Sequence, residues 1–225
     1  MGAIMGASMK RIAVLIAVAL FCAAGAIAET PVRPETVYLP PYPGISGWKK
    51  VTNVDNANQV YFEWIPDDQS LPDYKDILVE QAFPNAKQEP PQAFADRLTR
   101  GIGSACMKAA RNGPKTAIEH GFNVAYSQIY CVHVKKNTQD VDVFSKVIQG
   151  RNSLYVLQRE FHRPTEDGVP ATRAFPKGHE AEAKADMAAH LAAATYLDAV
   201  QVCPSLDGSP CPSPESAKAQ GAIPK

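Results

Sequence analysis

Four side chains in the second half of the chain have the chemistry of a hydrolytic site. They are Ser127, His133, Asp142 and His162. A serine activated by a histidine, which a carboxylate in turn orients, is a common arrangement for acyl transfer. These residues match no local motif, so a hydrolase is an alternative hypothesis that requires folding to bring them together, and the catalytic residues stay unassigned.

Histidine and cysteine spacing gives little support for a metal site. His179 and His190 could share one face of a helix, but at 1.5 Å per residue they would lie about 16 Å apart, too far to bind one ion. Cys131 and His133 could bind copper or zinc only if Cys131 formed no disulfide. We therefore expect no metal and no cofactor.

The first 28 residues have the pattern of a secretory signal peptide. Met9-Lys10-Arg11 is basic, residues 12–21 are apolar, and Ala26-Ile27-Ala28 supplies the small residues that signal peptidase requires. Cleavage after Ala28 would place the mature chain in the periplasm or outside the cell, whether translation starts at Met1 or at Met9. An uncleaved anchor is the alternative, although the apolar run is shorter than the about 20 residues of a membrane span.

Four cysteines follow the leader: Cys106, Cys131, Cys203 and Cys211. An even number in an exported chain favours two disulfides over a free catalytic thiol, and four cysteines allow three pairings. Cys106 falls on the apolar stripe of an expected helix, and Cys131 falls in the strand expected after it. The preferred pairing is therefore Cys106–Cys131, joining helix to sheet, with Cys203–Cys211; the other two pairings stay open.

Charge excludes some classes of partner. Without its leader the chain has 21 basic and 23 acidic side chains among 197 residues. A near-neutral chain lacks the basic surface typical of nucleic-acid binding. It also lacks a polybasic cluster for anionic membranes, so we expect neither nucleic acid nor stable membrane insertion after cleavage.

The composition divides the chain into three parts after the leader. Residues 29–43 and 212–225 are rich in proline and are expected to be an extended arm and a disordered tail. Residues 44–211 are expected to form one domain. Its strands are predicted near residues 48–51, 60–65, 77–83 and 122–134, and on both sides of a turn at 150–153 within residues 141–161.

Two helices complete the prediction. The first begins at Pro90-Pro91 and has an apolar residue every fourth position: Phe94, Leu98, Ile102 and Cys106. The second covers about residues 180–199, with its buried face at Met187, Leu191, Ala194 and Leu197. The order β-β-β-α-β-β-β-α indicates an α+β domain with an antiparallel sheet of about six strands.

One strand presents a candidate binding face. Tyr126, Gln128 and Tyr130 alternate along the predicted strand at 122–134 and therefore share one side of it. Such a patch could stack on a glycan or receive a protein partner. The alternative is burial beneath a second layer of the fold.

Three segments carry a resemblance to a known group of proteins. They are residues 60–66, 71–79 and 147–158. Over about residues 48–203 the chain resembles small exported proteobacterial proteins of unassigned function, and its element order is similar to the PsbP/Mog1-like α/β/α sandwich. The resemblance implies that fold and an accessory role, and it supplies no catalytic residues.

The leading hypothesis is a non-catalytic periplasmic binding or envelope-accessory module, whose partner is an envelope protein or a glycan. It follows from the leader, the predicted disulfides and the lack of an assembled catalytic motif. A periplasmic hydrolase is the first alternative. A secreted effector is the second, because a leader specifies export and not the final location.

Overall fold

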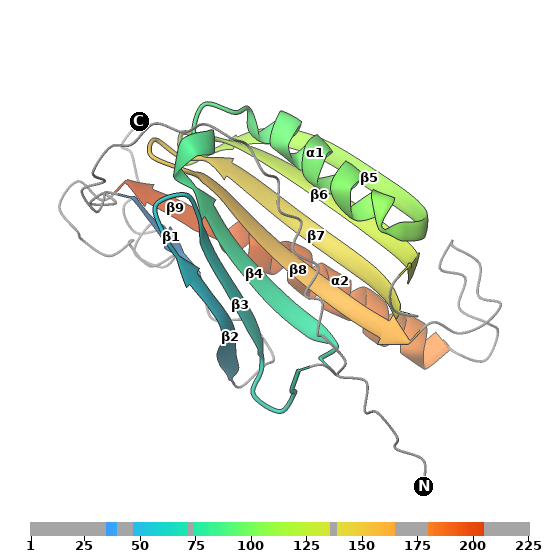
Figure 1. Ribbon diagram of the computed structural model, residues 1–225. Helices are drawn as coiled ribbons and strands as arrows, with labels where there is room; N and C mark the ends of the chain where they lie inside the picture. Colours follow the sequence, from blue (N-terminus) through green and yellow to red (C-terminus); the bar gives the residue numbers. More distant parts are fainter. Residues whose placement is uncertain (1–34, 40–46, 72–73, 136–138, 165–179, 205–225) are drawn as a thin grey trace, which may run out of the picture.

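The computed structural model describes residues 35–39, 47–71, 74–135, 139–164 and 180–204. It contains an antiparallel sheet with one helix on each face (Figure 1). The strands are β1 (Glu35–Tyr38), β2 (Trp48–Asp55), β3 (Val60–Pro66), β4 (Asp76–Phe83), β5 (Cys106–Glu119), β6 (Phe122–Val134), β7 (Gln139–Gln149), β8 (Leu154–Pro164) and β9 (Gln201–Pro204). The helices are α1 (Pro91–Ser104) and α2 (Glu180–Ala199), with a 3-10 turn, η1, at Pro84–Ala86.

The main sheet has seven strands in the order β2-β3-β4-β8-β7-β6-β5. The chain builds β2, β3 and β4 as neighbours, and α1 then carries it to β5 at the far edge. From there β5 to β8 return strand by strand until β8 pairs with β4. The predicted α+β class is confirmed, with one more strand in the main sheet than the six expected. A separate pair, β1 with β9, includes residues 35–38 of the predicted arm.

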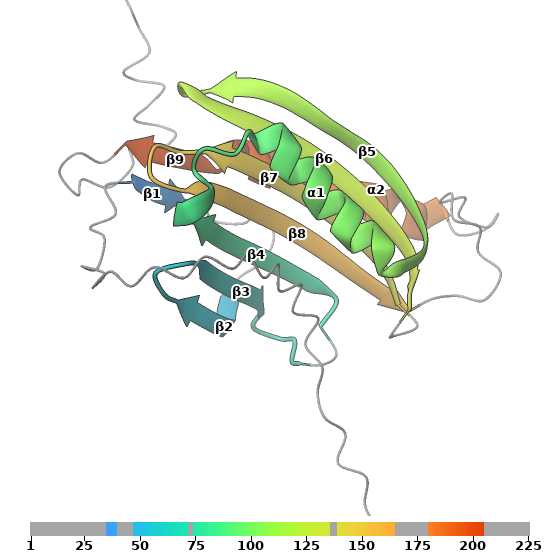
Figure 2. The same ribbon diagram turned by 45° about the horizontal axis from the view of Figure 1, so that its top comes forward.

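The two faces of the sheet pack against different helices, because successive side chains of a strand point to opposite sides. On one face Val147 packs with Phe94 of α1, and on the other Ile148 packs in a cluster with Leu197 of α2. Figure 2 shows α1 lying along β6 and β7, with β2, β3 and β4 beyond its edge. The hairpin predicted at 141–161 is β7 and β8, joined at Gly150.

The edge strand β5 was absent from the sequence prediction. Most of its side chains are exposed, so it lacks the alternation by which a half-buried strand is recognised. Its register with β6 shifts between Asn112 and Lys115, where Pro114 lies. A bulge, a proline and lysines are typical of an edge strand that resists pairing with another chain.

Helix α1 ends earlier than its apolar stripe predicted. Its last residue is Ser104, and the N–H of Ala105 donates a hydrogen bond to the carbonyl of Ile102 at 2.9 Å. Cys106 is therefore the first residue of β5, paired with Val134, and not a helical residue. The glycines at 101 and 103 weaken the helix at this end, each by up to about 1 kcal/mol.

The predicted buried face of α2 is wrong at three of its four positions. Met187 and Leu191 are 72% and 68% exposed, and Ala194 is exposed as well. Leu197 alone of the predicted four is buried. The reason is that polar side chains of α2 pair with charged residues of the sheet. This pairing sets the rotation of the helix and leaves its apolar residues facing outward.

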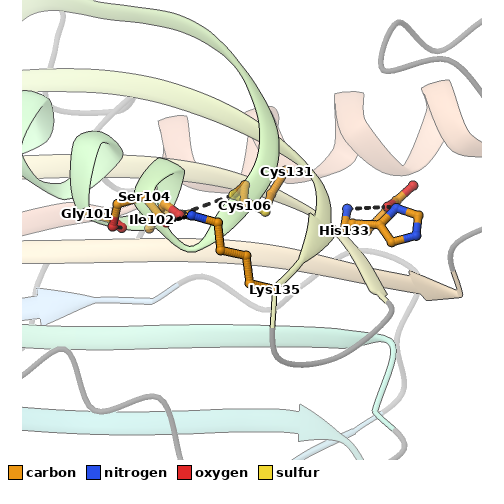
Figure 3. The surroundings of a disulfide bond; sticks show 8 residues. Gly101, Ile102, Ser104, Cys106, Cys131, His133 and Lys135 are labelled. Atoms are coloured by element: carbon orange, nitrogen blue, oxygen red, sulfur yellow. Dashed lines mark hydrogen bonds and ion pairs between the residues drawn. A yellow bond between two sulfur atoms is a disulfide. The ribbon is translucent and has the colours of Figure 1, made fainter.

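The disulfide between Cys106 and Cys131 joins the start of β5 to β6 (Figure 3). Both side chains are buried in a cluster with Ile129. This bridge is the first of the two in the preferred pairing, although it links neighbouring strands and not a helix to the sheet. The second, Cys203–Cys211, cannot be followed because Cys211 lies outside the described residues, although Cys203 belongs to β9.

Removing this bridge should destabilise the fold. The cysteines are 25 residues apart, and a loop of that length corresponds to about 3 kcal/mol of unfolding free energy. We expect urea unfolding of Cys106→Ala/Cys131→Ala to show a loss of that size, and the wild type under reductant to approach it. An unchanged unfolding midpoint in the double variant would contradict the contribution of the bridge.

Candidate functional site

The four candidate hydrolase residues do not assemble into one site. Ser127 alternates with Ala125 and Ile129, which face α1, whereas Asp142 points toward α2 and lies 3.1 Å from His190. The Ser127 hydroxyl is buried and has no hydrogen-bond partner within the described residues. A serine without a neighbouring base has no group to accept its proton. The sheet therefore separates the nucleophile of this set from its acid.

The two candidate histidines each contact acceptor side chains. The backbone N–H of His133 donates to Asp140 Oδ1 at 2.9 Å, and its ring Nδ1 lies 4.0 Å from the same oxygen. The ring of His162 lies between Glu160 Oε2 and Gln139 Oε1, at 3.3 and 3.4 Å. Neither histidine is positioned to activate Ser127.

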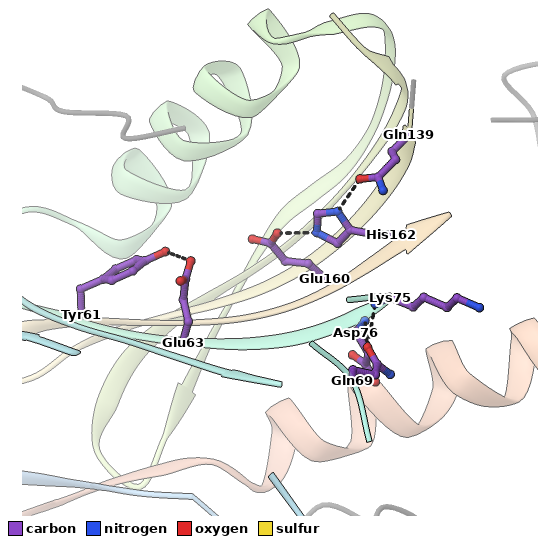
Figure 4. Close-up of polar contacts among 8 residues, drawn as sticks. All are labelled: Tyr61, Glu63, Gln69, Lys75, Asp76, Gln139, Glu160 and His162. Carbon is purple, nitrogen blue, oxygen red and sulfur yellow. Dashed lines mark hydrogen bonds and ion pairs between the residues drawn. The ribbon is translucent and has the colours of Figure 1, made fainter. Parts of the chain in front are cut away.

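Polar side chains of β3 and β8 form a cluster, and Figure 4 shows Tyr61 and Glu63 of β3 with Glu160 and His162 of β8. The Tyr61 hydroxyl donates to Glu63, and the Tyr74 ring meets the edge of His162 with centroids 4.8 Å apart. Burial, followed by the hydrogen bond to Glu63, raises the pKa of Tyr61. Burial and the charge of Glu160 raise the pKa of Tyr74 to about 12. Both phenols therefore remain protonated at neutral pH, and neither is suited to act as a base.

The predicted binding face is used within the fold. Tyr126, Gln128 and Tyr130 share the α2 side of β6, as expected, and all three are half-buried. Each donates a hydrogen bond to a carboxylate; the acceptors are Glu119, Asp142 and Asp140, at 2.6, 3.1 and 3.3 Å. These contacts hold strands and turns together, and a binding role for the three side chains remains a prediction.

An ion-pair network joins α2 to the sheet. Asp142 is 2% exposed and lies 3.1 Å from His190 Nε2, and the other ring nitrogen lies 3.5 Å from Asp186 Oδ2. Arg163 of β8 forms an ion pair with Asp186. Aromatic rings pack on the imidazole, those of Phe144 and Phe161. From the sequence, His190 was considered only as a metal ligand. Its pairing with Asp142 was missed because no local spacing of residues indicates it.

Lys146 ties the end of α2 to the sheet. Its ammonium is fully buried, lies 2.7 Å from Glu119 Oε2, and donates to the carbonyls of Leu197 and Val200 at 3.0 and 2.9 Å. Burial lowers the pKa of Lys146, and the carboxylate of Glu119 opposes that effect. Carbonyls at a helix end have no partner within the helix, so this lysine acts as its cap.

A hollow in the surface lies at one end of the main sheet. It has a volume of about 340 Å³ and lies where the β5–β6 turn and the β7–β8 turn meet the segment after η1. Each of these three segments contributes one basic side chain: Lys87, His120 and Arg151. The other lining residues are Gln88, Gly121, Phe122, Asn123, Gln149 and Gly150. We call this feature the basic hollow.

Hydrogen bonds fix the walls of the basic hollow. Asn123 Nδ2 donates to Gln149 Oε1, and Gln149 Nε2 donates to the carbonyl of Lys87, both at 3.1 Å. His120 and Gly121 have φ angles of 49° and 82°, and two successive positive φ values are typical of a two-residue hairpin turn. The turn therefore presents the imidazole at the tip of the hairpin.

The β7–β8 turn beside the basic hollow already binds one carboxylate. The N–H groups of Arg151 and Asn152 donate to the two oxygens of Glu35 at 2.6 and 2.9 Å. Successive backbone N–H groups that converge in this way form an anion-binding nest. The backbone here thus favours negative charge.

No family model matches the chain, and no curated protein is significantly similar to it in sequence. Among the described residues, no group of three or more histidine, cysteine, aspartate or glutamate side chains is arranged to hold a metal ion. No helix in the same part of the chain is long and apolar enough to cross a membrane. The case for function therefore rests on the geometry of the basic hollow.

Substitution of Asp142 tests the α2 network. Asp142→Ala would leave Gln128 and His190 without their buried acceptor, and we expect a loss of about 3 kcal/mol in unfolding free energy. The exposed Asp68→Ala is the matched control and should change it by less than about 0.5 kcal/mol. Urea unfolding measures both, and equal effects would show that Asp142 does not hold α2.

The raised pKa of Tyr74 predicts that the free energy of unfolding depends on pH in the alkaline range. A phenol ionises near pH 10 in the unfolded chain and, for Tyr74, near 12 in the folded one. The folded state thus binds more protons between these values, so unfolding free energy falls as pH rises from 10 to 12.

We expect Tyr74→Phe to reduce that fall and to remove a phenol that ionises near pH 12 from the absorbance titration at 295 nm. In urea the remaining tyrosines should ionise near pH 10. An unchanged high-pH step in the folded variant would refute this assignment.

Proposed function

We propose that the protein is an exported, non-catalytic binding or envelope-accessory module, and that the basic hollow takes the anionic group of an envelope saccharide. The observation that carries this proposal is the convergence of Lys87, His120 and Arg151 on one open hollow. The leader sequence and the Cys106–Cys131 bridge support export, because disulfides persist in oxidising compartments.

The charges of the basic hollow favour an anion. The side chains of Lys87 and Arg151 form no ion pair within the described residues, and both residues line the hollow. A guanidinium can bind a carboxylate or a phosphate through two parallel hydrogen bonds, and an ammonium adds a point charge. The nearby carboxylate of Glu35 is already satisfied by two N–H donors and faces the turn.

The remaining lining suits a saccharide. The amide groups of Gln88 and Asn123 line the hollow, and an amide can both donate to and accept from a hydroxyl group, although Asn123 Nδ2 already donates to Gln149. Phe122 is buried, so the hollow offers little apolar surface to an apolar ligand. Among the described residues, the lining has no serine, cysteine or carboxylate, which favours binding over hydrolysis.

Binding of glucuronate, with glucose as the neutral comparison, tests this proposal. We expect calorimetric or NMR titration to show saturable binding of glucuronate that weakens as salt screens the charges, and no binding of glucose. Lys87→Gln and Arg151→Gln should each weaken binding at least about fivefold, since each removes a charge-assisted contact.

Lys108→Gln supplies the control for these variants. Lys108 is exposed on β5 near the disulfide, at the opposite end of that strand from His120, and the substitution changes net charge equally. If Lys108→Gln weakened glucuronate binding as much as Arg151→Gln, the effect would be one of net charge and not of the hollow. Failure of glucuronate to bind at millimolar concentration would overturn the proposal.

A further inference from the structure

The outward face of α2 is apolar, and this is unusual for a helix packed on a sheet. Met187 and Leu191 are large hydrophobic residues of the helix that are exposed, and Ala188 and Ala194 beside them are also exposed. Figure 1 places α2 on the side of the sheet opposite α1. A contiguous exposed apolar face of this kind marks an interaction surface.

The rotation of α2 is set by its inner face. His190 and Asp186 turn toward the sheet because Asp142 and Arg163 lie there as charged partners. A helix whose polar residues point inward must point its apolar residues outward. The exposure of Met187 and Leu191 is therefore a consequence of strong internal contacts.

The exposed residues follow a heptad spacing. Lys184, Leu191 and Asp198 are successive residues seven apart, and Met187 and Ala194 occupy the positions between them. All five are exposed. A seven-residue repeat with apolar residues at alternating spacings of three and four is the pattern of a helix that packs along another helix.

We propose that α2 docks antiparallel on α2 of a second copy of this chain, with Leu191 on the two-fold axis. Lys184 precedes Leu191 by seven residues, and Asp198 follows it by seven. In an antiparallel pair centred on Leu191, each lysine of one copy therefore meets the aspartate of the other. A two-fold interface requires this self-complementarity, and charge of opposite sign at equal distances provides it.

The remaining contacts fit the same pairing. Met187 would lie opposite Thr195, so that a large residue meets a smaller one, and Ala188 would lie opposite Ala194. Alanine at the seam lets two helix axes approach closely. One helix pair buries less than the about 1,200–2,000 Å² of stable interfaces, so we expect a dimer that forms at micromolar concentrations. The dimer is independent of anion binding at the basic hollow.

Sedimentation equilibrium of the full exported chain over a concentration series tests the dimer. We expect a monomer–dimer equilibrium for the wild type. For Leu191→Lys we expect the dissociation constant of the dimer to rise at least about tenfold, because the substitution buries two like charges on the axis. Ile118→Lys is the matched control because Ile118 is equally exposed, on β5 and away from α2. It should leave the equilibrium unchanged.

Cysteine crosslinking tests the orientation. When the Lys184→Cys and Asp198→Cys variants are mixed and oxidised, antiparallel packing should give mainly the mixed disulfide between the two variants. A parallel pair would give the two homodisulfides, and mass spectrometry distinguishes these products. Both residues are exposed, but Asp198 also hydrogen-bonds Tyr126, so circular dichroism must first show that Asp198→Cys keeps the wild-type fold.

Three results would overturn the proposal. A monomer at every concentration up to about 1 mM would exclude the dimer. A dimer that Leu191→Lys leaves intact would place the interface elsewhere, and a predominance of homodisulfides would exclude the antiparallel arrangement.

Discussion

Buried charge on the α2 face of the sheet is the constraint on which much of this structure depends. Asp142, Lys146 and Arg159 are almost completely buried, and an unpaired ion in such a place costs several kcal/mol. Each therefore has a partner: His190 for Asp142, the end of α2 and Glu119 for Lys146, and Asp76 for Arg159 at 2.5 Å. Two of these three arrangements determine where α2 lies.

The two helices consequently pack by different means. Helix α1 places Phe94 and Ala95 against aliphatic residues of the sheet, as expected for an amphipathic helix. Helix α2 meets the sheet through ion pairs over most of its length and through Tyr196 and Leu197 near its end. The apolar surface that α2 does not bury inside the domain is the surface that a second copy of the chain can cover.

Topology creates the basic hollow. Because α1 carries the chain across the sheet and β5 to β8 return as neighbours, the β5–β6 and β7–β8 turns emerge at the same end. The segment after β4 leaves the sheet there too, so Lys87, His120 and Arg151 converge from distant parts of the sequence. Exposed hairpin turns held by a rigid sheet are a common place for binding residues.

By itself, the sequence determined the elements whose signal is local. Alternation predicted the strands that became β3, β4, β6, β7 and β8, and the spacing of Phe94 and Leu98 predicted α1. The predicted leader and the even number of cysteines after it indicated a disulfide at Cys106 and Cys131. Tertiary structure alone decided the edge strand β5, the rotation of α2 and the basic hollow. An edge strand buries too few side chains to show a hydrophobic period. Met187 and Leu191 have the spacing of a buried face, but the contact between His190 and Asp142 turns them outward. Periodicity within a segment reports which residues share a side, whereas the partner of that side is chosen by charges and strands far away in the chain.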